Sequence, residues 1–249
     1  MNSDKNLESA YVRSYYDTFL SKYDKEYAYY RWAAGPVERL HFIQTRRTLL
    51  PYFNKITGSV LEIGGGDAVW TREYIDHVQK LTFLDISKEM ITRAQKRLVY
   101  FSQKITYVNS DFLQNDFPSN SFDHIVSIRN LEYFIDKKHF ISEVKRLLKD
   151  SGTFLLVTKS PQYSFHDNSQ GKLLHTAQIY IKELLKLIKS QGLKVIAVRP
   201  AIFGKLFRFS LVRFIFSIFH RILLSLPWKI APLRFLSYLS ESFMIYVQK

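Results

Sequence analysis

The sequence predicts a doubly wound α/β fold, and three observations predict it. An apolar run at residues 60–63 leads into a glycine turn at residues 64–66. An acid, Asp85, follows about 20 residues later at the end of a second apolar run. Further apolar runs then alternate with helical segments as far as Pro200. Such alternation is typical of strand–helix units built on one twisted sheet.

The order of the elements follows from these runs. Strands are expected within residues 60–63, 81–87, 104–112, 121–134, 147–161 and 193–200, with a last strand within 241–249. Helices are expected near residues 67–78, 87–101, 136–149 and 175–190. In the third of these, Phe140, Ile141 and Val144 recur at helical spacing. Ser87 is the expected N-cap of the second.

The glycine turn and the acid together indicate a cofactor that contains adenosine. Glycine lets the backbone approach a ligand where a Cβ would clash. An acid at the end of the next strand can accept hydrogen bonds from both ribose hydroxyls. A dinucleotide site would need a third glycine where Val69 stands, and a Walker loop would need a G-K-[ST] sequence, which is absent. Both of these nucleotide sites are therefore excluded.

Residues 62–68 read EIGGGDA, and this segment resembles the first motif of class I S-adenosylmethionine-dependent methyltransferases. In that family the motif is an acid-x-Gly-x-Gly-x-Gly turn, so Ala68 replaces the last glycine. The later strands follow in the family's order, and the resemblance covers roughly residues 55–200 and the last strand. It implies a seven-stranded Rossmann-like methyltransferase sheet with S-adenosylmethionine as cofactor. In the N-terminal segment the repeated Tyr-Asp, at residues 16–17 and 23–24, is similar to lids in small-molecule methyltransferases of the quinone-biosynthesis (methyltransferase type 11) group.

The resemblance also implies a set of cofactor-binding residues. Asp85 would bind the ribose, Ile86 would lie against the adenine, and Asp111 would accept from the adenine amine. The backbone N–H of Phe112 would reach the adenine ring, and Arg129 would line the methionine end. The full set is Glu62, Gly64, Gly65, Gly66, Asp85, Ile86, Asp111, Phe112, Arg129 and Tyr23. The alternative is that Asp85 and Asp111 are helix caps or turn residues.

Residues 1–54 precede the predicted sheet and are rich in tyrosine. They are expected to be helical, with a break at Gly35 and a new helix that begins at Pro36 and ends near Phe53. In the family, helices at this position form a lid over cofactor and acceptor. Most of the tyrosines are expected to pack on an amphipathic helix. Tyr23 alone is singled out as a cofactor contact.

Residues 201–240 separate the sixth strand from the last one, at 241–249, and form an insertion in the plain fold. Between Phe203 and Ser240 the insertion carries six basic residues and no acidic one. Arg208, Arg213 and Arg221 interrupt the apolar run, so it is not expected to span a membrane. On a helix its polar residues gather in one narrow sector opposite a broad apolar face.

That pattern is typical of a helix that lies in the membrane interface. Trp228, next to Pro227, would lie at the level of the lipid headgroups. The alternative is that the apolar face packs on the domain itself or on a second subunit, which would make the insertion a homodimer interface.

The composition narrows the choice of partners. The net charge of +14 indicates an anionic partner, either nucleic acid or a membrane surface. Nucleic acid is disfavoured because residues 127–130 read SIRN, not the Asn/Asp-Pro-Pro-aromatic signature of base methylation. There is no cysteine, and the histidines are scattered, so no disulfide and no metal site is expected. The N-terminus lacks the layout of a signal peptide, which favours the cytoplasm, peripheral on the inner face of the membrane.

Methyl transfer from a sulfonium needs mainly alignment and exclusion of water. An oxygen acceptor also calls for a general base, and His166, in a polar loop after the fifth strand, is the candidate. Arg129, Asn130 and Tyr133 follow the fourth strand, whereas His124 lies inside it and is expected to be packed.

The sequence thus predicts an S-adenosylmethionine-dependent methyltransferase acting on a small lipophilic or lipid-linked acceptor at a membrane surface. A quinone precursor and a polyprenyl-linked sugar are the acceptors considered. One alternative is a soluble small-molecule or sugar O-methyltransferase whose insertion is a dimer interface. The other, from a different class, is a non-catalytic assembly subunit that binds the cofactor without turnover.

Overall fold

The computed structural model describes residues 2–21, 27–161, 177–202, 215, 218, 219, 222 and 240–249. Seven strands form one sheet: β1 (Gly58–Ile63), β2 (Val78–Asp85), β3 (Ile105–Asn109), β4 (Phe122–Ile128), β5 (Leu148–Lys159), β6 (Lys194–Ile202) and β7 (Ser242–Gln248). Their order is β3-β2-β1-β4-β5-β7-β6, and only β7 runs antiparallel to its neighbours. The predicted fold class is confirmed.

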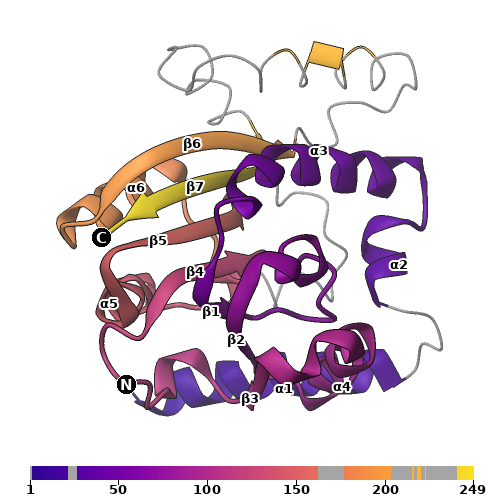
Figure 1. The fold of residues 1–249 in the computed structure, drawn as a ribbon, viewed down its shortest axis with the longest axis horizontal. Helices are drawn as coiled ribbons and strands as arrows, with labels where there is room; N and C mark the ends of the chain where they lie inside the picture. The colour runs from indigo at the N-terminus through magenta and orange to yellow at the C-terminus, as the bar shows by residue number, and fades with distance from the viewer. Residues whose placement is uncertain are drawn as a thin grey trace.

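Helices cover both faces of the sheet (Figure 1). They are α1 (Asn2–Ser21), α2 (Tyr27–Trp32), α3 (Pro36–Phe53), α4 (Lys88–Arg97), α5 (Lys137–Leu147) and α6 (Ile181–Ser190). Strand residues alternate between the two cores: Val60 packs on the side of α3 and α4, and Leu61 packs on the side of α5 and α6. The sheet is therefore the middle layer of three.

The N-terminal helices pack near both edges of the sheet. Helix α3 begins at Pro36, as predicted, because proline fixes φ and lacks the N–H that a first-turn residue leaves unpaired. Helix α3 packs on β6, and α1 packs beside α4, next to β3 (Figure 1). The rings of Trp32 and Phe42 pack against Trp70 at 5.1 and 5.0 Å between centroids, which ties α2 and α3 to the segment after the glycine turn.

The prediction of an α-helix near residues 67–78 is wrong. Two 3₁₀ helices occupy this segment, η1 (Thr71–Glu73) and η2 (Ile75–His77). The hydroxyls of Thr71 and Tyr74 donate to the buried Glu62 carboxylate at 2.6 and 2.8 Å. Because the segment is short and rich in aromatic and β-branched residues, these tertiary hydrogen bonds outweigh its weak helix propensity.

The other predicted elements differ from the structure mainly at their ends. Ser87 caps α4 as predicted and accepts from the Met90 N–H, but the helix stops at Arg97 and a 3₁₀ helix, η3 (Val99–Lys104), follows. Helix α6 begins at Ile181, later than expected. Most of the insertion at residues 201–240 lies outside the described residues. Within the described part of the chain, no helix has the length and apolar character to cross a membrane.

Candidate functional site

A cavity of about 490 Å³ lies at the carboxyl ends of the parallel strands, beside the point where the strand order reverses between β1 and β4. Its floor comes from the segments after β1 to β5 and from the residue before β7: Gly64, Gly65, Gly66, Asp67, Asp85, Ile86, Ser110, Asp111, Phe112, Arg129, Asn130, Lys159 and Glu241. Its roof comes from α1, α2 and α3: Ser9, Val12, Tyr15, Tyr16, Tyr27, Arg31, Trp32, Val37, Glu38 and His41. Residues of α1, α2 and α3 thus line the same cavity as most of the predicted cofactor residues.

The glycine turn has a backbone that other residues rarely adopt. Gly64 has φ +66°, and a Cβ there would lie 2.1 Å from the Asn130 side-chain nitrogen. Gly66 has φ +59°, and nothing lies within 4 Å of the place its Cβ would occupy. Gly64 is therefore needed for packing, whereas Gly66 leaves open space on the cavity side, where the backbone of a ligand-binding turn must be approached closely.

Ala68, at the place of the last glycine in the motif, also has a left-handed backbone, with φ 62°. It is fully buried. The segment before it is held from α4, where the Arg97 Nε donates to the Asp67 carbonyl at 2.7 Å and a guanidinium nitrogen lies 3.3 Å from the Asp67 carboxylate. The turn is therefore held in shape although its final residue carries a Cβ.

Glu62 does not line the cavity. Its buried carboxylate accepts the hydroxyl protons of Thr71 and Tyr74, and burial raises its pKa from 4.5 to about 7. In this structure Glu62 therefore connects β1 to the segment beyond the glycine turn, and the cofactor contact predicted for it stays a prediction.

Asp85 ends β2 and lines the cavity. One carboxylate oxygen accepts from the Gly66 N–H at 2.9 Å and the other from the Ser87 N–H at 2.9 Å. Burial raises its pKa to about 6. Asp85 thus stabilises the turn and also lines the cavity. The structure is consistent both with a turn residue and with a ribose ligand at this position.

Asp111 has a similar double position. Its Oδ1 accepts from the Leu113 N–H at 2.9 Å, which caps the 3₁₀ helix η4 (Phe112–Gln114), and its Oδ2 accepts from the Ser9 hydroxyl of α1 at 2.5 Å. On α1, Asp17 also accepts from the Ser87 hydroxyl at 2.5 Å. Helix α1 is therefore docked on both predicted adenosine-binding segments.

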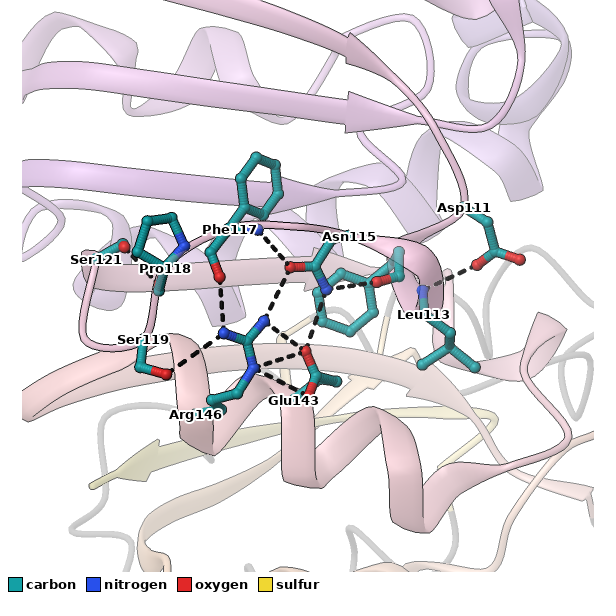
Figure 2. Close-up of polar contacts among 10 residues, drawn as sticks. Asp111, Leu113, Asn115, Phe117, Pro118, Ser119, Ser121, Glu143 and Arg146 are labelled. Atoms are coloured by element: carbon teal, nitrogen blue, oxygen red, sulfur yellow. Dashed lines mark hydrogen bonds and ion pairs between the residues drawn. The ribbon is translucent and has the colours of Figure 1, made fainter.

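The chain that follows Asp111 is held by α5, as Figure 2 shows. Arg146 donates to the Phe117 carbonyl at 2.7 Å and to the Asn115 side chain at 3.1 Å, and pairs with Glu143 at 2.8 Å. The Asn115 amide in turn donates to Glu143 at 3.2 Å. This cluster fixes the loop between β3 and β4 and, through it, the position of Asp111.

The opposite end of the cavity is rich in ionisable side chains. Arg129 has a left-handed backbone, with φ 59°, and its Nε donates to Glu132 at 2.8 Å. The hydroxyls of Tyr16 and Tyr133 lie 2.5 Å apart, which joins α1 to the segment after β4. Burial raises the pKa of both tyrosines, so they are neutral hydroxyls at pH 7.

The structure therefore brings most of the predicted site residues into one cavity: Gly64, Gly65, Gly66, Asp85, Ile86, Asp111, Phe112 and Arg129. Tyr23 and His166 lie outside the described residues. Asn130 and Tyr133 line the cavity as well. His124 bonds Thr153 of the neighbouring strand at 2.7 Å, the packed position expected for it.

Several residues that line the cavity were not predicted from the sequence, among them Arg31, His41 and Glu241. No motif marks them, because they come from the roof helices and from the start of the last strand. The only signal in the sequence was the expected position of the N-terminal helices over the site.

Comparisons with known proteins agree with this geometry. Residues 60–152 match the model of a family described as "Methyltransferase domain". The chain is 28% identical over 100 residues to 2-methyl-6-phytyl-1,4-hydroquinone methyltransferase 1 of Oryza sativa, covering 39% of this chain and 30% of that one. It is 34% identical over 103 residues to the uncharacterized methyltransferase YcgJ of Bacillus subtilis, covering 39% of each. The chain thus spans less than two thirds of the length of the curated relatives it matches.

Solved structures resemble the whole fold. The N-methyltransferase NodS of Bradyrhizobium japonicum, in complex with S-adenosyl-L-homocysteine, superposes with a TM-score of 0.62 at 16% identity and covers 94% of this chain and 98% of its own. The fold is therefore the Rossmann-like methyltransferase fold. The family match identifies residues 60–152 as a methyltransferase domain, and the motif residues within it resemble those of class I S-adenosylmethionine-dependent methyltransferases.

Proposed function

We propose that the protein binds S-adenosylmethionine in the 490 Å³ cavity and transfers its methyl group to a small lipophilic or lipid-linked acceptor at a membrane surface. The observation that carries the cofactor assignment is the open space at Gly66 beside the carboxylate of Asp85. A cavity of this size holds a nucleoside-sized ligand with room for part of a second molecule.

The chain's own residues divide the work along the cavity. The glycine turn allows close approach of the cofactor, Asp85 accepts from the ribose, and Asp111 with the Phe112 N–H recognises the adenine. Arg129 lines the cavity and would contact the methionine end of the cofactor. Bound S-adenosylmethionine supplies a methyl group activated by its sulfonium. The roof helices exclude water and align the acceptor, which is the main requirement of an in-line displacement.

The lipophilic acceptor is proposed from the position of the insertion. The Glu241 N–H donates to the Ile202 carbonyl at 2.8 Å, so the insertion begins and ends at neighbouring points of the sheet. Glu241 also lines the cavity. Ile215, Ile218, Phe219 and Ile222, spaced as one helical face, have exposed fractions of 40 to 55%. An apolar face within a basic segment favours contact with an anionic membrane next to the acceptor end of the cavity.

The rice relative supports a quinone-type acceptor, since its name assigns it a prenylated hydroquinone. A polyprenyl-linked sugar would meet the same requirement for a polar head that enters the cavity and a tail that stays in lipid.

The cofactor assignment is tested with Asp85→Asn. This variant keeps one oxygen for a backbone N–H and removes the charge and one acceptor. Hydrogen bonds to charged groups contribute about 1.5–3 kcal/mol, so the dissociation constant for S-adenosylmethionine is expected to rise roughly 10- to 100-fold in calorimetry. The matched control is Asp150→Asn, whose side chain is 99% exposed, and its affinity should stay unchanged. Equal affinities for Asp85→Asn and the parent protein would overturn the ribose assignment.

A further inference from the structure

Two acid–base side chains in the cavity, a histidine and a glutamate, have an imidazole or a carboxylate oxygen without a hydrogen-bond partner among the described residues. His41, on α3, is 8% exposed, lines the cavity, and its imidazole makes no hydrogen bond with the described part of the chain. Glu241, just before β7, is also 8% exposed, and its buried Oε2 has no hydrogen-bond partner there. Buried polar groups are almost always hydrogen-bonded, so two unpaired groups in one cavity point to a ligand.

The two groups interact electrostatically. Burial lowers the pKa of His41, and the Glu241 carboxylate opposes this shift in part. Arg31 and Arg129 also lower the pKa of His41, and Glu38, on the same helix, raises it. His41 is therefore a neutral imidazole at pH 7 that can accept a proton. Once protonated, it is stabilised by the neighbouring Glu241 carboxylate.

We propose that His41 is the general base of the methyl transfer, that Glu241 is its positioning residue, and that the acceptor atom is the oxygen of a phenol- or enol-type hydroxyl. This inference rests on the proposed function. In the step, a His41 ring nitrogen takes the hydroxyl proton while the oxygen forms a bond to the methyl carbon. The methyl–sulfur bond breaks, its electron pair stays on sulfur to give S-adenosylhomocysteine, and the imidazolium releases its proton to water.

Arg31 supports an oxygen acceptor rather than an amine. Its guanidinium lines the cavity, stacks on the Trp32 ring at 4.6 Å, and forms no hydrogen bond or ion pair with the described residues. Burial and the neighbouring Arg129 lower its pKa, whereas Glu241 opposes this shift, and the guanidinium brings a positive charge to the cavity wall. A protonated amine would add to this charge, whereas a developing oxyanion would offset it.

The test compares His41→Gln with the exposed His139→Gln on α5 as matched control. Tritiated methyl transfer is measured at saturating S-adenosylmethionine with a demethylated prenylhydroquinone and with total lipid extract. His41→Gln is expected to lose about 100-fold or more in kcat, the lower end of general-base contributions, and to keep its S-adenosylmethionine affinity within about threefold. His139→Gln should match the parent protein. Base-stable O-methyl ethers are the expected products.

Glu241→Gln separates a positioning role from a structural one. Removing the carboxylate lowers the pKa of His41 further, so the acid limb of the kcat profile should move to lower pH. The same shift should appear in the NMR titration of His41 in the S-adenosylhomocysteine complex, a readout that needs no turnover. In His41→Gln the acid limb should be absent and the rate should rise with hydroxide.

Four results would overturn the inference. The first is a His41→Gln rate within about threefold of the parent, and the second is a loss of cofactor affinity in that variant as large as its loss of kcat. The third is a His41 pKa above 7.5, and the fourth is a product that carries the methyl group on carbon or nitrogen. Cofactor binding by the parent protein without transfer to either probe would overturn the proposed function together with this inference, and would favour the non-catalytic subunit.

Discussion

Glu62 is a buried acid whose protonation state decides how it affects stability. Its pKa is raised from 4.5 to about 7 by burial, against the opposing effect of hydrogen bonds from Thr71 and Tyr74. The folded state therefore binds a proton more strongly than the unfolded chain does. Its contribution to stability is complete below pH 4.5 and is lost as the pH rises through about 7.

Glu62→Gln should remove this pH dependence. Glutamine resembles the protonated acid and can still accept from both hydroxyls, so at pH 5 the free energy of unfolding should change little. At pH 8 the variant should be more stable than the parent protein by roughly 2–3 kcal/mol. Urea unfolding at pH 5 and at pH 8 measures the free energy of unfolding of the variant and of the parent protein. The control Glu89→Gln alters a half-buried helical pair with Arg93 and should move stability by less than about 1 kcal/mol at either pH.

An equal effect of Glu62→Gln at pH 5 and pH 8 would contradict a raised pKa. The motif identified Glu62 as part of the site, but a motif does not say which way a side chain points. The neighbours that draw Glu62 away from the cavity, Thr71 and Tyr74, became visible only with the packed structure.

At the scale of elements, the loop between β3 and β4 depends on α5. Arg146 is the centre of that contact, because one guanidinium reaches the loop backbone at Phe117 and the side chains of Asn115 and Glu143 (Figure 2). Since Asp111 belongs to the same loop, its position is set by a residue that lies outside the cavity.

Arg146→Met should lower the free energy of unfolding by about 1–3 kcal/mol, because it removes several hydrogen bonds and leaves the Glu143 carboxylate without its ion-pair partner. Thermal or urea unfolding measures the loss. Lys138→Met, at an exposed position of the same helix, is the matched control and should be nearly neutral. A similar effect of both variants would mean that the Arg146 cluster does not hold the loop.

Elements were predictable where local pattern and tertiary packing agree. Helix α5 follows its apolar spacing, and α3 begins at Pro36 as proline chemistry requires. The segment after the glycine turn was predicted wrongly because its side chains bond across to β1 and not along a helix. Long-range hydrogen bonds of this kind leave no periodic signal in the sequence.

At the scale of the molecule, the predictable half of the site is the half that topology determines. Parallel strands bring their carboxyl ends together, so Asp85, Asp111 and Arg129 meet whatever the packing details are. His41 and Glu241 reach the same cavity only through the docking of α3 on β6 and through the pairing of the last strand. Their convergence depends on contacts between distant parts of the chain.

The insertion leaves the sheet at Ile202 and returns to it at Glu241, two residues that are hydrogen-bonded to each other, so it can be removed without breaking the core. Because the Glu241 N–H already bonds the Ile202 carbonyl, a short turn containing Asn-Gly can replace residues 203–239 and close β6 and β7 into a hairpin. This variant should keep its fold and its S-adenosylmethionine affinity. It should no longer float with phosphatidylcholine vesicles that contain phosphatidylglycerol, although the full chain does.

A milder variant tests the apolar face itself. Ile215→Ser with Ile218→Ser removes two exposed side chains, 54% and 46% exposed, and should weaken vesicle binding at least about tenfold, since each buried methylene contributes about 0.8 kcal/mol. The matched control, Val99→Ser with Tyr100→Ser, removes exposed apolar groups after α4 and should bind as the full chain does. If the full chain never floats but sediments as a dimer that the hairpin variant cannot form, the insertion is a subunit interface and the membrane proposal fails.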